Sequence, residues 1–282
     1  MPEEAVSPQS AEAITKLQSE LSNVQRDLEA IKIAGAFSAQ KWFQNPSVLI
    51  SLLALLFSFG TTGVSFYRIN QQFVHDARTE LRGLIQRLNQ LPRENLEYYK
   101  KYADDPQAQT SMSSFVNAEN ALVAKQAAEV IERIPGDVGA TEYSLVAYAL
   151  NNSALVDKAI KLFEQGLLVS NDVNDEAALL RSYGATLINT GNIAKGRDQF
   201  KKALEVFQKY TPMNQGYVEF THFYTELNWG NAELSVRQCS EAKRHLESAE
   251  HHLTALPPGP VTESYKGELN LLRQQIANCV PA

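Results

Sequence analysis

The chain has 282 residues, with 26 lysines and arginines against 32 aspartates and glutamates, and a formal net charge of −6 at pH 7. An acidic chain without a basic tract argues against a nucleic-acid binder, which normally presents a basic face. Glycine and proline are sparse, at 14 and 11 residues, and this scarcity of breakers predicts an all-α protein.

The N-terminal part is predicted to be a short disordered segment followed by a coiled-coil helix. Residues 1–10 include the breaker-rich stretch PEEAVSP. In residues 11–36, apolar side chains recur at alternating spacings of three and four, which places them on one seam of a helix. This seam predicts either self-association as a homodimer through Leu17, Leu21 and Leu28, or packing of an amphipathic helix on its own protein. The seam consists of Ile14, Leu17, Leu21, Val24, Leu28 and Ile31.

Residues 47–67 form a block that predicts one transmembrane helix. No charged side chain lies between Lys41 and Arg68, and this stretch would rise about 31 Å as a helix, close to the hydrocarbon thickness of a bilayer. Two alternatives are a buried core helix and a cleaved signal peptide. The second fits worse because about 40 residues with several glutamates precede the block. Its membrane-embedded side chains include Leu49, Leu52, Leu56 and Phe59.

The charges that flank the block favour a cytoplasmic C-terminal part in a plasma or inner membrane. Lysine and arginine accumulate on the cytoplasmic side of membrane helices. The margin is two charges, with Lys32 and Lys41 before the block against Arg68, Arg78, Arg82 and Arg87 after it.

A second apolar seam follows the block and predicts a helical stalk over residues 68–92. Pro92 is expected to end the stalk, and residues 93–112 are expected to form a linker. The seam predicts either self-association through Leu81, Leu84 and Leu88 or packing of an amphipathic helix on its own protein. Its members are Val74, Ala77, Leu81, Leu84, Leu88 and Leu91.

The C-terminal part contains an internal repeat. In YSLVAYALNNSALVDKAIKLFEQGL, residues 143–167, and LRSYGATLINTGNIAKGRDQFKKAL, residues 180–204, two small residues lie twelve apart and a phenylalanine follows four later. Small residues let two antiparallel helices cross closely, while the ring fills the space beside them. The copies are Ala147, Ala159 and Phe163; Gly184, Gly196 and Phe200; and a third set, Gly230, Ala242 and Leu246.

This spacing resembles the tetratricopeptide repeat. The resemblance implies an α-solenoid over residues 113–282, closed by a capping helix near residues 262–278. It also implies that the first helix of each repeat lines a groove for an extended peptide or a helix. The lysine and asparagine clamp that some members use for a terminal carboxylate is not present. The groove candidates are Tyr148, Arg181, Tyr224, Asn228 and Asn231.

The residues that could be catalytic or metal-binding are better explained as structural or solvent-exposed side chains. GNIAKGRD, residues 191–198, approaches a phosphate-binding loop, but Arg197 and Asp198 replace the required lysine and hydroxyl. Glu241 and His245 are four apart on a helix, without an HExxH pattern, and we interpret them as part of an exposed polar face. Cys239 and the cysteine at position 279 lie outside any metal spacing, and two buried free thiols are preferred over a disulfide.

These observations predict a membrane-anchored adaptor that binds a protein partner and uses no cofactor or metal. The alternative is a membrane-tethered chaperone or assembly factor whose repeat domain lies on the exported side of the membrane. An enzyme with an unrecognised site is the third interpretation, since a repeat scaffold does not define an activity.

Overall fold

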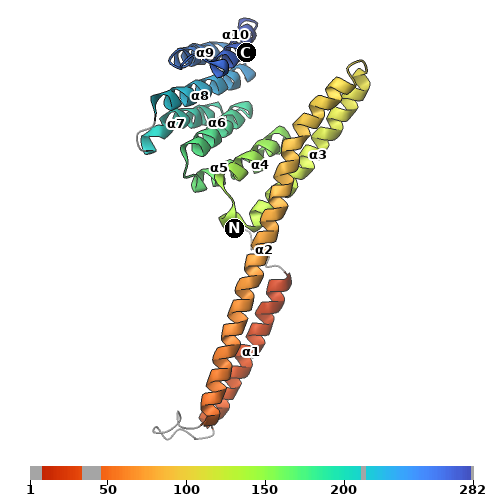
Figure 1. Cartoon of the computed structure of the whole chain (residues 1–282), viewed down its shortest axis with the longest axis vertical. Helices are drawn as coiled ribbons and strands as arrows, with labels where there is room; N and C mark the ends of the chain where they lie inside the picture. The colour runs from red at the N-terminus through yellow and green to blue at the C-terminus, as the bar shows by residue number, and fades with distance from the viewer. Residues whose placement is uncertain (1–7, 34–45, 211–213, 281–282) are drawn as a thin grey trace. The chain divides into compact units, whose positions relative to one another are not determined.

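The computed structural model describes residues 8–33, 46–210 and 214–280, and every regular element in these ranges is a helix (Figure 1). The all-α prediction is therefore confirmed for this part of the chain. Residues 1–7 of the segment predicted to be disordered, and residues 34–36 of the predicted coiled-coil helix, lie outside these ranges. The chain divides into two units, residues 1–71 and residues 72–282.

The first unit contains helix α1 (Pro8–Ile33) and the first part of helix α2 (Pro46–Lys101). Leu21 and Leu28 of the predicted coiled-coil seam lie on α1 and are more than half exposed. The Leu17 side chain lies outside what the structure describes. Val24 of the same seam is half-buried, and with Leu21 it lines a cavity shared with α2, so the chain itself covers the described seam only in part.

The apolar block forms the N-terminal part of α2, which begins at Pro46, a residue suited to the first turn of a helix. Its side chains are uncovered, and none of the most apolar 18-residue window is buried. A core helix would be mostly buried, so the structure gives the soluble-core interpretation no support. Among the described residues, α2 is the one helix long and apolar enough to span a membrane. The four predicted membrane-embedded residues, Leu49, Leu52, Leu56 and Phe59, are all exposed.

The prediction that the stalk ends at Pro92 and is followed by a linker was wrong. Helix α2 continues through Pro92 to Lys101, and helix α3 (Pro106–Arg133) begins after only four residues. A proline inside a helix removes one backbone hydrogen bond. Here Arg87 bridges the proline by donating from Nη1 and Nη2 to both carboxylate oxygens of Glu94, at 2.5 and 3.0 Å. This bidentate contact stabilises the two turns that flank Pro92.

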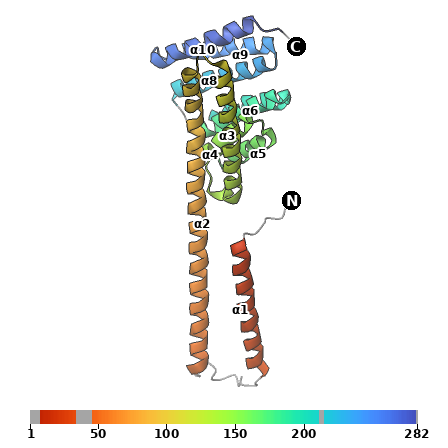
Figure 2. The same ribbon diagram turned by 90° about the vertical axis from the view of Figure 1, so that its right-hand side faces the viewer.

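The second apolar seam packs inside its own domain, which corrects the assignment of Leu81, Leu84 and Leu88 to self-association. Leu81 and Leu88 are buried, and Leu84 packs partly buried against the same core. Helix α3 runs back along this part of α2 in both views (Figures 1 and 2). The heptad spacing fits a neighbouring helix of any origin, and α3 supplies it. Ion pairs from Arg87 to Glu119 and from Arg133 to Glu80 join the two helices at 2.7 and 2.6 Å.

Three helical hairpins and a final helix complete the second unit. Each hairpin packs its two helices together, and the first helices of successive hairpins contact one another. The final helix packs on the last hairpin through Leu269 and Leu272. The hairpins are α4 (Ala140–Asn152) with α5 (Val156–Val169), α6 (Val173–Asn189) with α7 (Ile193–Glu205), and α8 (Gln215–Ser235) with α9 (Cys239–Thr254), followed by α10 (Pro260–Ala277).

The small residues of the repeat lie where the paired helices cross. A Cβ atom on Gly196 would lie 2.6 Å from the carbonyl oxygen of Gly184, and one on Gly184 would lie 2.8 Å from Cδ2 of Phe200. Ala147 and Ala159 are buried in the preceding hairpin. The spacing in the sequence therefore marks real points of close helix contact.

Replacing Gly196 by alanine is expected to lower the free energy of unfolding of the domain by about 2 kcal/mol, because the new methyl group meets backbone atoms that cannot move aside. The matched control is Gly267→Ala on α10, where a Cβ meets nothing within 4 Å. That change should stabilise the helix by up to about 1 kcal/mol. Thermal unfolding of the full chain, followed by circular dichroism, measures both. Equal midpoints for the two variants would contradict the close crossing.

Candidate functional site

The predicted groove residues lie on the first helices of the three hairpins, and the structure brings two of them together. Arg181 on α6 lies over the ring of Tyr224 on α8, with its guanidinium carbon 5.1 Å from the ring centroid. Its Nη1 lies 3.5 Å from Oγ1 of Thr225. Tyr217, at the start of α8, is also close enough to interact electrostatically with Arg181. We call Arg181, Tyr217, Tyr224 and Thr225 the Arg181 cluster.

The other three candidates are not drawn into this cluster. Asn228 and Asn231 donate from Nδ2 to backbone oxygens of their own helix, at 2.7 and 2.9 Å. Tyr148 on α4 is more than half exposed and, among the described residues, has no hydrogen bond or ring contact with the others. These three side chains remain exposed or half-exposed on first helices, where a ligand can reach them.

The cluster holds a cation in a partly desolvated environment. Burial lowers the pKa of Arg181, because removing a guanidinium from water disfavours its charged form. No carboxylate in the described part of the chain forms an ion pair with it. The nearby Tyr217 donates its hydroxyl proton to Asn174, and burial raises the pKa of Tyr217. Arg181 is therefore a half-buried charge that the described chain does not neutralise.

Aromatic packing fixes the Tyr224 ring beneath Arg181. The ring of Phe220 stacks on Tyr224 with an interplanar angle of 12°, and Tyr265 from α10 meets it edge-on. Tyr265 also contacts Phe223, which is completely buried. Helix α10 thus supports the Tyr224 ring over which Arg181 lies.

A second polar cluster, missed by the sequence analysis, is buried between α7, α8 and α9. Glu233 is fully buried and accepts hydrogen bonds from Arg197 Nε and Nη2, at 2.7 and 2.8 Å, and from Trp229 Nε1, at 2.9 Å. Burial by itself raises the pKa of Glu233, but the hydrogen bonds from Arg197 and Trp229 outweigh it and leave that pKa below its ordinary value. Arg197, from the segment resembling a phosphate-binding loop, is thus committed to a structural ion pair.

His245 was wrongly placed on an exposed polar face. It is buried, stacks on Trp229 with centroids 3.9 Å apart, and its Nδ1 lies 2.5 Å from Oε2 of Glu226. The helical pattern of α9 places His245 one turn from Ala242 and Ala249, on the side that faces α8. In the described residues, no group of three histidine, cysteine or acidic side chains is arranged to hold a metal.

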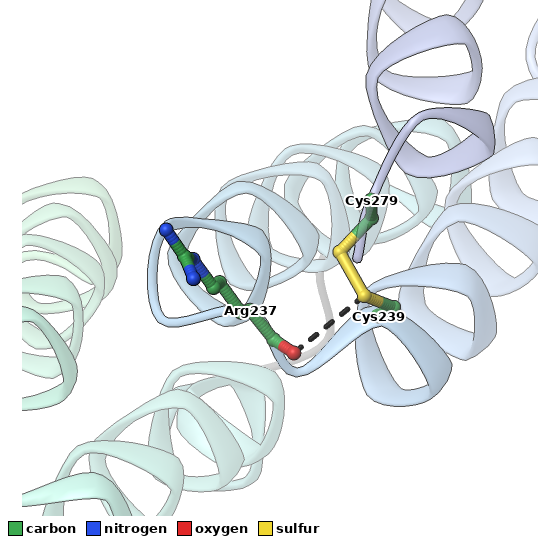
Figure 3. The surroundings of a disulfide bond; sticks show 3 residues. All are labelled: Arg237, Cys239 and Cys279. Atoms are coloured by element: carbon green, nitrogen blue, oxygen red, sulfur yellow. Dashed lines mark hydrogen bonds between the residues drawn. A yellow bond between two sulfur atoms is a disulfide. The ribbon is translucent and has the colours of Figure 1, made fainter. Parts of the chain in front are cut away.

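The two cysteines form a disulfide, which corrects the interpretation of them as buried free thiols (Figure 3). Cys239 begins α9 and Cys279 follows α10, with Cα atoms 5.9 Å apart. Both side chains are partly exposed. The bond lies beside the turn between α8 and α9, where Arg237 has a left-handed backbone conformation with φ of 59°. The disulfide ties the end of α10 to the start of α9.

A cavity of about 430 Å³ lies between α2 and α4, within the second unit. Its wall on α2 is polar and basic, and Leu145 from α4 adds an apolar side chain. Neither Arg82 nor Arg93 forms an ion pair among the described residues. The lining residues are Arg82, Ile85, Gln86, Asn89, Gln90, Arg93, Glu142 and Leu145.

Comparisons with protein-family models, curated proteins and solved structures found no match to this chain. The resemblance to the tetratricopeptide repeat therefore stays a prediction from the spacing of small residues.

Proposed function

We propose that this chain is a single-pass membrane protein whose C-terminal helical domain binds a protein partner and performs no chemistry. The observation that carries the proposal is the exposed apolar block of α2, since an uncovered segment of this length and composition is stable in hydrocarbon and unstable in water. The same helix continues into the core of the second unit, where Leu81 and Leu91 are buried. A partner of that unit would therefore be held at a membrane.

Insertion of the block requires α1 to remain in water. A cavity of about 240 Å³ between α1 and the apolar part of α2 is lined partly by Glu20. Each charged side chain at the centre of a bilayer costs about 2.5–3.5 kcal/mol. Helix α1 therefore separates from the block as the block enters the membrane. Its charged residues include Lys16, Glu20, Arg26, Asp27 and Glu29.

We assign self-association to α1. The stalk seam is occupied by α3, whereas Leu21 and Leu28 on α1 are more than half exposed. Anchoring in a membrane raises the local concentration of identical helices and so favours a homodimer through Leu17, Leu21 and Leu28. The structure describes a single chain, so this part of the proposal rests on the spacing and exposure of α1.

The arrangement of the hairpins supports binding over catalysis. We propose that they form a solenoid like the tetratricopeptide repeat, in which α4, α6 and α8 present one continuous surface. Tyr148, the Arg181 cluster and Asn231 lie along these helices. The fully buried Glu233 is paired with Arg197 and Trp229, and this supports a structural role for these three residues.

The disulfide favours the second predicted function, an envelope chaperone or assembly factor on the exported side. Disulfides persist in oxidising compartments and are rare in the cytosol. The bond between Cys239 and Cys279 therefore argues for an exported domain, against the small charge excess that favoured the cytoplasm. Long domains are translocated largely regardless of flanking charge, which reconciles the two observations.

Binding through the first helices can be tested with a photo-reactive residue placed at Tyr148 or Asn231 of the full chain in cells. Both positions are exposed, so the substitutions should not disturb folding. We expect light to produce the same discrete crosslinked product from both positions. The control is position Lys201, which is exposed on α7, a second helix. Products of equal yield from all three positions, or from Lys201 alone, would contradict a binding surface on α4, α6 and α8.

A further inference from the structure

Arg181 differs from two other half-buried arginines of the described domain in having no carboxylate. Arg87 is paired with Glu94 and Glu119, and Arg197 is paired with Glu233. Withdrawing a guanidinium from water is unfavourable unless an opposite charge compensates. The domain therefore keeps a destabilising charge at Arg181, on a first helix of the proposed binding surface.

The donors of Arg181 are available to a ligand. A guanidinium carries five N–H donors, and within the described part of the chain the only hydrogen bond of Arg181 is the long contact with Thr225. The Thr225 hydroxyl itself donates to the carbonyl oxygen of Thr221, at 2.7 Å. Some described side chains have a polar atom that is buried and has no hydrogen-bond partner, and Arg181 is not one of them. Its free N–H groups thus reach the surface.

The cluster matches a single negative charge on a planar group. The guanidinium carbon of Arg181 lies over the Tyr224 ring, and a carboxylate binds a guanidinium through two parallel hydrogen bonds from its N–H donors. The surrounding side chains Phe220, Tyr217 and Tyr265 are aromatic. No second cation is found against Arg181 in the described residues, so a doubly charged phosphate would be left half-neutralised.

We propose that Arg181 binds the side-chain carboxylate of an aspartate or glutamate within the partner's segment, with Tyr224 holding the guanidinium in place. This inference rests on the proposed function and specifies the chemistry of the partner. The acidic residue supplies the counter-ion that the domain lacks, so the charge that destabilises the free protein becomes favourable in the complex. Arg181 thereby contributes both to the affinity for the partner and to the preference for an acidic residue in it.

The test selects ligands from a displayed library of random 12-residue peptides, fixed to linkers at both ends so that no terminal carboxylate is present. The target is the full chain in lipid nanodiscs. We expect the selected peptides to share an aspartate or glutamate at one position. Changing that glutamate to glutamine should weaken binding about 30-fold, the value of a charge-assisted hydrogen bond. Arg181→Met should weaken it equally, and combining the two changes should cause no further loss.

Two further variants complete the design. Arg181→Lys keeps the charge but loses the planar pair of donors, so it should bind about 5- to 10-fold more weakly than the wild type. Lys201→Met, on a second helix, should bind the peptides normally. Because the glutamine peptide is measured on the wild-type chain, the comparison remains decisive even if an Arg181 variant fails to fold.

The possible failures are distinguishable. Peptides whose binding depends on Tyr148 but shows no acidic preference would overturn the carboxylate inference and leave the proposed function standing. A parallel set of synthetic peptides carries a free C-terminus. If only these peptides bind, the ligand of Arg181 is a terminal carboxylate, and the side-chain carboxylate inference is overturned. If no selected peptide is weakened by changing Tyr148, Arg181 or Asn231, the inference and the proposed binding surface both fail.

Discussion

Replacing Arg197 by methionine is expected to lower the free energy of unfolding by about 3 kcal/mol. The change leaves Glu233, which has no exposed surface, without the two hydrogen bonds that keep it charged. Removing one partner of a buried ion pair typically costs about 3–5 kcal/mol, and the lower value applies because the Arg197 side chain is about one-third exposed. The same substitution at Arg181 removes a charge without a carboxylate, so Arg181→Met should unfold no more easily than the wild type.

The fluorescence of Trp229 reports this region directly, because Trp229 donates to Glu233. Trp42 is the other of the two tryptophans in the chain, so a Trp42→Phe background makes the signal specific. The pair Lys202 and Asp198, exposed on the same helix, is the control, and Lys202→Met should cost less than about 0.5 kcal/mol. The double variant Arg197→Met, Glu233→Gln should recover much of the loss. Equal effects of the Arg197 and Lys202 substitutions on the free energy of unfolding would show that the burial of Glu233 does not strengthen its ion pair with Arg197.

Features set by local spacing were predicted well. The twelve-residue gap between Gly184 and Gly196 follows from two antiparallel helices and a short turn, and the structure shows these glycines in close approach. The apolar block and the helix after the PPGP segment, residues 257–260, also depend on nearby residues alone. Hydrophobic period and helix breakers determine such elements before any tertiary contact is considered.

Features set by distant contacts were predicted poorly. The stalk seam has the spacing of a coiled coil, but that spacing cannot distinguish α3 from a second chain as the neighbour of Leu81 and Leu88. Pro92 signals a helix end, yet Arg87 and Glu94 bridge it. His245 was placed in solvent because its neighbours in the sequence are polar, whereas its position on the helix directs it toward Trp229.

The Arg181 cluster was predicted in part. The repeat register placed Arg181 and Tyr224 on a common predicted surface, and the structure shows these two side chains in contact. The absence of a carboxylate near Arg181 could not be predicted from the sequence, because Glu176 and Asp175 lie only five and six positions before it along the chain. Only the tertiary arrangement decides which of them reach the guanidinium.

Loss of the disulfide is expected to have the largest effect on the stability of the C-terminal end. By the chain-entropy relation, a bond between cysteines 40 residues apart stabilises the fold by about 4 kcal/mol. Helix α10 carries Leu269 and Leu272 into the core around Phe223, so release of its end should loosen that core. The variant with both Cys239 and Cys279 changed to serine should therefore unfold at a clearly lower temperature, and a reductant should lower the midpoint of the wild type but not that of the variant.

The same bond makes the location of the domain measurable in cells that carry the full chain with a tag after Ala282. The cells are quenched in acid, and the protein is treated with a thiol-reactive polymer. Without reduction it should remain unmodified, because both thiols are held in the bond between Cys239 and Cys279. After reduction it should gain two adducts. Protease added outside the cells, or outside the inner membrane of a two-membrane cell, should then remove the tag while a known internal protein survives. Two reactive thiols together with a protected tag would place the domain in the cytoplasm and would show that the flanking charges, not the disulfide, were the correct guide to topology.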